Sequence, residues 1–201
     1  FGTIHWPFLH RNVRFTGFYA AVAGTGLPHE QRFWRMMERL PELPPATYHV
    51  AIMHYWLFME RPDEPAWDLT DGDQYDNWYF SIDPPHRQRL WELLKASGVD
   101  ILFCGHVHTG RPVQVVDGIR LYRTQAAGNT AQLSELWPDA DTRFGFHRCD
   151  VSDKGIDVTF IEGDDQSEEF DSYGPMGHPP VAGRDYSVAR EKPPLHPELE
   201  K

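Results

Sequence analysis

Cysteine is scarce in this chain, which holds only Cys104 and Cys149 among its 201 residues. Two cysteines cannot staple a domain of this size, and the sequence has no Cys-x-x-Cys pair to form a zinc ribbon or a redox motif. Both thiols lie in apolar or mixed runs typical of strands, so we expect them to be buried and free. The sequence therefore excludes disulfide scaffolds and cysteine-rich zinc sites.

Long apolar runs and positive charge are lacking as well. No stretch approaches the ~18 apolar residues of a membrane helix, and no signal peptide is visible. Lysine and arginine number 19 against 30 acidic residues, which gives a formal net charge of −11. An acidic chain gains nothing from phosphate backbones, which excludes a role in coating nucleic acid. From these absences we expect no membrane span and a cytoplasmic location.

The remaining composition is that of a globular protein, with 40% hydrophobic and 13% aromatic residues. This length favours a single domain with a sizeable core. We expect that domain to occupy residues 1–165. An acidic and then Pro/Gly-rich tail, residues 166–201, is expected to be irregular.

Strand and helix patterns alternate through the first part of the chain. Strand regions are expected at 13–24, 48–56 and 99–104, and helices at 29–40 and 85–98. The nearly continuous apolar residues of 48–56 suit a strand that is buried on both faces. This order predicts an α/β fold built from a βαβαβ unit with a parallel sheet.

Antiparallel hairpins are expected to follow. Asp117-Gly118 separates two apolar runs, 113–116 and 119–124, and this dipeptide is a strong hairpin signal. A second hairpin is expected from 144–151 and 156–161. Between the helical regions, residues 60–83 form a polar insertion with interleaved aromatic residues, which we expect to be a long loop that shapes a pocket.

The motif that carries chemistry is Gly105-His106-Val107-His108, which directly follows the short apolar strand 99–104. Residues i and i+2 of an extended backbone point the same way, so both imidazoles are expected to face one point. His54 lies near the end of the preceding strand region. Imidazole suits zinc, iron and manganese, and ligand sites lie at strand ends in open α/β sheets. His54, His106 and His108 are therefore candidate metal ligands.

In this context the residues resemble the calcineurin-like metallophosphoesterases, over about residues 13–161. The resemblance rests on Gly105-His106-Val107-His108 after a short strand, on the preceding helix with Gly98-Val99-Asp100, and on His54 at the end of an upstream strand. It implies a four-layer α/β/β/α sandwich, in which the later hairpins form a second sheet.

The resemblance also implies hydrolysis of a phosphate mono- or diester at a two-metal site of manganese, iron or zinc. His54 and His106 would bind one ion and His108 the other, and a hydroxide bridging the ions would attack phosphorus. Arg111, close to the histidine turn, would contact the anionic phosphate ester.

The family's Asp-x-His, Gly-Asp and Gly-Asn-His motifs, which should precede this region, are missing. Gly72-Asp73, Gly163-Asp164 and Gly128-Asn129-Thr130 occur in the wrong order, and the last lacks its histidine. The chain therefore resembles the C-terminal part of such an enzyme. Alone, it is expected to be inactive, to bind at most one ion weakly, and to self-associate through a sheet edge left unpaired.

Other readings stay open. A cupin also uses His-x-His, but it needs a Glu four or five residues later, where this chain has Pro112 and Val113. The acidic stretch around Asp71-Gly72-Asp73 lacks the spacing and distal Glu of an EF-hand loop. The alternative function is that of a truncated or degenerate, non-catalytic fold that binds a partner.

Overall fold

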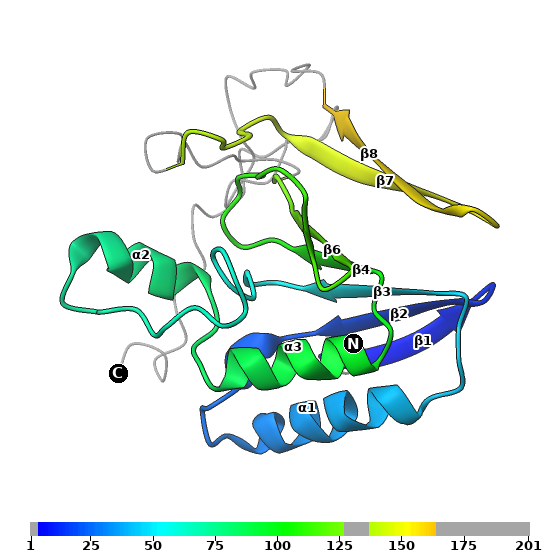
Figure 1. The fold of residues 1–201 in the computed structure, drawn as a ribbon, viewed down its shortest axis with the longest axis horizontal. Helices are drawn as coiled ribbons and strands as arrows, with labels where there is room; N and C mark the ends of the chain where they lie inside the picture. The colour runs from blue at the N-terminus through cyan, green and yellow to red at the C-terminus, as the bar shows by residue number, and fades with distance from the viewer. Residues whose placement is uncertain (1–3, 127–136, 164–201) are drawn as a thin grey trace, which may run out of the picture. The chain divides into compact units, whose positions relative to one another are not determined.

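A computed structural model describes residues 4–126 and 137–163. The expected domain boundary at residue 165, the tail 166–201 and Gly128-Asn129-Thr130 lie outside the described residues. The fold is mixed α/β, with a six-stranded mixed sheet and a separate two-stranded antiparallel sheet (Figure 1).

Three parallel strands form the centre of the large sheet, as the βαβαβ pattern predicts. They are β2 (Val13–Phe18), β3 (Tyr48–Met53) and β4 (Ile101–Cys104), paired in that order. Helix α1 (Pro28–Arg39) connects β2 with β3, and α3 (His86–Ala96) precedes β4. Two short 3-10 helices, η1 (Ala20–Val22) and η2 (Leu40–Glu42), flank α1.

The strands at both edges of this sheet differ from the expectation. The sequence reading missed β1 (Trp6–His10), which pairs antiparallel with β2 and forms one edge. At the other edge, Asp117-Gly118 joins β5 (Gln114–Val116) to β6 (Ile119–Arg123) as expected, and both turn residues have positive φ. However, β6 pairs in parallel with β4. This hairpin therefore extends the large sheet and does not belong to a second one.

The two faces of the large sheet are covered differently. Alternate side chains of each strand join two cores, because neighbouring residues of a strand point to opposite faces. Leu102 and Ala51 pack with α1 and α3, whereas Val50 and Ile101 pack against Ile156. Ile156 belongs to the hairpin of β7 (Gly145–Ser152) and β8 (Gly155–Glu162), which was expected from the sequence. Figure 1 shows α1 and α3 on one side of the sheet and this hairpin on the other.

The insertion 60–83 is not the loop without elements that we expected, since it contains helix α2 (Gly72–Phe80). Cys104 is buried, but Cys149 is exposed, so the expectation of two buried thiols is wrong for Cys149. Cys149 lies on β7, a strand of a sheet with only two strands, which leaves part of that strand open to solvent. In the described part of the chain, no helix is long and apolar enough to cross a membrane.

Candidate metal centre

The candidate site lies at the carboxyl ends of β3 and β4. These neighbouring parallel strands end in register, with Met53 opposite Cys104. The backbone N–H of Gly105 donates a hydrogen bond of 2.9 Å to the carbonyl of His54, which continues the pairing past both strand ends. The sheet therefore holds the two histidine segments side by side.

The structure brings His54 and His106 together. Nδ1 of His106 lies 3.1 Å from Nε2 of His54. Two nitrogens that each lie about 2.1 Å from one ion and are about 3.1 Å apart subtend an angle of about 95° at that ion. The pair thus has the spacing of either a hydrogen bond or two ligands of one metal ion. Nε2 of His106 is buried and has no hydrogen-bond partner among the described residues.

His108 is placed differently. Its side chain is exposed, and no hydrogen bond or ring contact within the described residues joins it to the other two rings. The expected extended geometry is wrong, because His106 and His108 have φ of 74° and 61° in the left-handed region. This conformation costs roughly 1–2 kcal/mol for a residue with a Cβ. Gly105 does not have a positive φ, so the strained backbone falls on the histidines and not on the glycine.

Aromatic rings surround His106. The ring of Tyr55 lies 4.0 Å from it, centroid to centroid, and the ring of Tyr79 lies at 5.3 Å. Burial, together with the nearby rings of His54 and His108, holds the pKa of His106 below its usual value. The neutral imidazole, which is the form that binds metals, is therefore favoured.

The described residues supply part of a ligand set for one metal ion and no ligand set for a second ion. Among the described residues, no group of three or more His, Cys, Asp or Glu side chains is placed to hold a metal ion. His54 and His106 can supply two ligands of one ion. The described residues provide neither a carboxylate nor a second set of ligands for another ion.

Arg111 is occupied by protein carboxylates. Its guanidinium pairs with Glu60 at 2.9 Å and with Asp139 at 3.1 Å, and only 13% of its side chain is exposed. A phosphate contact at Arg111 would have to replace one of these partners.

The insertion 60–83 is anchored by a buried ion pair that the sequence analysis did not identify. Arg87 of α3 donates to the Glu64 carboxylate at 3.1 Å and to the carbonyls of Pro62 and Ile82. The Glu64 carboxylate also accepts three backbone N–H groups, from Met59, Glu60 and Arg61. A lone buried arginine within an amphipathic helix pattern could have signalled such a partner, because buried charges need one.

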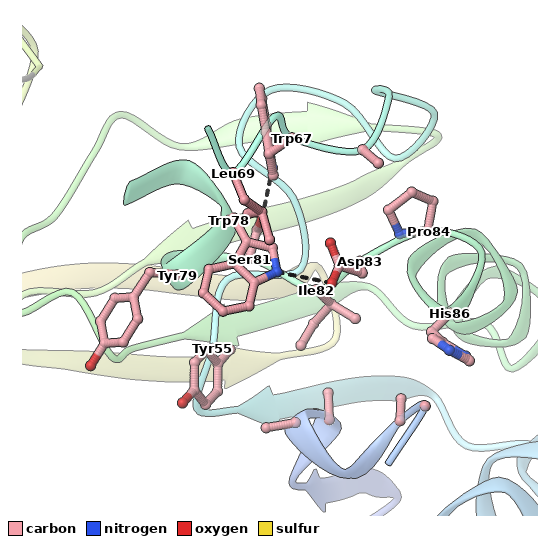
Figure 2. Close-up of a pocket in the computed structure, with 15 residues that line it drawn as sticks. Tyr55, Trp67, Leu69, Trp78, Tyr79, Ser81, Ile82, Asp83, Pro84 and His86 are labelled. Atoms are coloured by element: carbon pink, nitrogen blue, oxygen red, sulfur yellow. Dashed lines mark hydrogen bonds between the residues drawn. The ribbon is translucent and has the colours of Figure 1, made fainter. Parts of the chain in front are cut away.

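A pocket of about 650 Å³ lies next to the histidine pair. The insertion forms one wall of it, and residues 20–24 form another (Figure 2). Tyr55 and Tyr79, which contact His106, also line this pocket. The candidate metal centre and the pocket therefore share two aromatic side chains.

Comparisons with known proteins give little further guidance. No family model and no curated protein matches the sequence. Among solved structures, the chain is similar to one titled "GAP50 the anchor in the inner membrane complex of Plasmodium", with 15% sequence identity and a TM-score of 0.48. The match covers 79% of this chain and 49% of that one, so the chain spans about half the length of this relative. At this level of similarity, neither an activity nor a partner can be transferred to this chain.

Proposed function

We propose that the protein containing this chain is a metal-dependent phosphoesterase, and that His54 and His106 bind a divalent ion in it. The observation that carries the proposal is the 3.1 Å separation of their ring nitrogens at the ends of two adjacent parallel strands. The left-handed backbone of His106 supports it, because strained residues concentrate at functional sites.

A bound manganese, iron or zinc ion would polarise a phosphoryl oxygen and lower the pKa of a bound water. His54 and His106 would orient the ion at the sheet edge, and the rings around His106 would limit access of bulk water. The second ion and the four-layer sandwich that the family resemblance implies belong to this proposal, and their further ligands would come from outside the described residues. His108 and Arg111 stay candidates for the second ion and for the phosphate ester.

The test combines metal binding with hydrolysis. Titration calorimetry with Zn²⁺ and Mn²⁺ should show binding that is lost in His54→Ala and in His106→Ala but kept in His10→Ala, a change at an exposed position on β1. The natural full-length protein should hydrolyse bis(p-nitrophenyl) phosphate or p-nitrophenyl phosphate, and EDTA should abolish the activity. Unchanged metal binding in both site variants would contradict the proposal.

A non-catalytic, partner-binding fold is the second candidate. It is favoured by the lack of any group of three metal-ligating side chains among the described residues. Absence of both metal binding and hydrolysis in the full-length protein would support this alternative.

A further inference from the structure

The pocket beside the histidine pair has an unusual lining. Four aromatic side chains line it: Tyr55, Trp67, Trp78 and Tyr79. No ring contact between described residues joins any two of these four rings. Tyr55 and Tyr79 each contact the ring of His106, and Trp78 contacts that of Tyr75, so the four rings line the pocket from separate positions.

The charge of the lining is negative. Among the described residues, Asp83 is the only carboxylate of the lining, and neither lysine nor arginine takes part in it. The lining also contains the imidazole of His86, and this ring packs against the backbone of Gly24. A phosphate group would therefore meet no fixed cation here, whereas a positively charged group would meet a carboxylate.

The polar edges of the two tryptophans are already used. Nε1 of Trp67 donates to the Ser81 hydroxyl at 3.1 Å, and Nε1 of Trp78 donates to the Asp83 carboxylate at 3.0 Å (Figure 2). The Ser81 hydroxyl in turn donates to the carbonyl of Asn77. Neither indole N–H is therefore available to a sugar hydroxyl or a base edge. What the pocket offers is π-faces together with one carboxylate.

We propose that this pocket binds a quaternary ammonium group. Such a cation has no N–H to donate, is attracted to the faces of aromatic rings, and gains from a carboxylate close by. The hydrogen bond from Trp78 fixes the Asp83 carboxylate beside an indole ring, so the charge and a π-face are held together. Neutral apolar guests of the same shape would gain only the burial of their surface.

The position of the pocket also suggests a substrate class for the enzyme. This step rests on the proposed phosphoesterase function. Tyr55 and Tyr79 line the pocket and also contact His106. A ligand that has its ammonium group in the pocket and extends past Tyr55 and Tyr79 would reach the histidine pair. The substrate class is accordingly a phosphate ester of a quaternary-ammonium alcohol.

The binding test uses the protein without added metal. Choline chloride is titrated by calorimetry at constant ionic strength, with 3,3-dimethyl-1-butanol as the uncharged molecule of the same shape. Choline should bind at least about tenfold more tightly than the neutral alcohol. Asp83→Asn keeps an acceptor for Trp78 and should weaken choline binding about fivefold or more while leaving the neutral alcohol unaffected.

Two further results separate this proposal from the phosphoesterase proposal. Choline binding should persist in His54→Ala, because that change leaves the pocket lining intact. If choline binds but the full-length protein hydrolyses no phosphate ester, the phosphoesterase function fails and the pocket assignment stands. Equal affinities for choline and the neutral alcohol, or no binding of either, would overturn the pocket assignment.

Discussion

Arg87 and Glu64 form a buried ion pair, with Nη1 of the arginine 3.1 Å from Oε1 of the glutamate and side-chain exposures of 0% and 8%. Hydrogen bonds to the backbone offset the free-energy cost of removing both charges from water. The arginine donates to carbonyls, and the glutamate accepts from N–H groups. The pair joins α3 to the residues at both ends of the insertion.

Removing one member of this pair should destabilise the protein strongly. Arg87→Met leaves the Glu64 carboxylate buried and unpaired, and we expect a loss of about 3–5 kcal/mol in the free energy of unfolding. Urea denaturation followed by circular dichroism measures it. The matched control is Arg61→Met, which removes an exposed ion pair with Asp63 and should cost at most about 1 kcal/mol. Similar losses in the two variants would show that the Arg87 pair is not buried in solution.

The pH dependence of stability should include a contribution from His49. Its ring is buried between Thr16 and the Ser97 carbonyl, and burial lowers its pKa from the usual 6.5. A lowered pKa favours the neutral ring in the folded state. The stabilisation is therefore fully present above the unfolded pKa of about 6.5 and is lost as the pH falls through the folded pKa.

Urea midpoints at pH 7.5 and 5.5 test this expectation. The urea concentration at the unfolding midpoint of the wild type should be lower at pH 5.5 than at pH 7.5. His49→Gln should be less stable at pH 7.5 by about 1–3 kcal/mol, because buried partners lose their bonds, but its midpoint should fall less on acidification. His10→Gln, at an exposed position of β1, should show the same decrease in midpoint between pH 7.5 and 5.5 as the wild type. If the midpoint of His49→Gln decreased as much as that of the wild type, His49 would not contribute to the pH dependence of stability.

The left-handed backbone at His108 predicts a preference for glycine. With φ at 61°, any side chain is strained, so His108→Gly should be more stable than His108→Ala by roughly 0.5–1 kcal/mol. The same pair of substitutions at His10, within strand β1, should rank the other way, because glycine weakens a strand. Thermal unfolding of the four variants provides the comparison, and equal stability of both His108 variants would count against the strained turn.

Self-association through a sheet edge stays a prediction. In the described part of the chain, strand β1 pairs only with β2, and it carries exposed Phe8 and Leu9, at 50% and 58% of their full exposure. Exposed apolar edge strands invite pairing with another chain, and a lysine on the edge opposes it. Sedimentation velocity should therefore show association that rises with concentration and weakens in Leu9→Lys. Leu69→Lys, at an equally exposed position in the insertion, should leave the association unchanged.

The elements that the sequence predicted well are those with a strong local signal. Asp117-Gly118 identified its hairpin, and the apolar run before Gly105 identified β4, because turn chemistry and hydrophobic runs act over a few residues. The parallel pairing of β6 with β4 could not be predicted from local sequence, because tertiary packing decides which strand of the sheet a hairpin pairs with. Strand β1 was missed because its residues are mostly exposed and do not alternate clearly.

The candidate site was predicted in part. The sequence predicted that His54, His106 and His108 meet at one sheet edge, because they follow two adjacent buried strands, and the structure brings His54 and His106 together there. It could not show that His108 has a left-handed backbone and an exposed side chain, which depends on the turn as folded. Nor could it show that Arg111 is neutralised by Glu60 and Asp139, residues remote from it in sequence.

The Arg87–Glu64 pair has a consequence for how the pocket can change. It closes both ends of the insertion at one point, so the residues between Pro65 and Trp78 form a segment that can vary, whereas Tyr79 and Phe80 contact His106. Substitutions, deletions or grafted sequences in this segment alter one pocket wall while β3 and β4 keep His54 and His106 in place. The binding selectivity that we propose for the pocket can thus diversify through this segment.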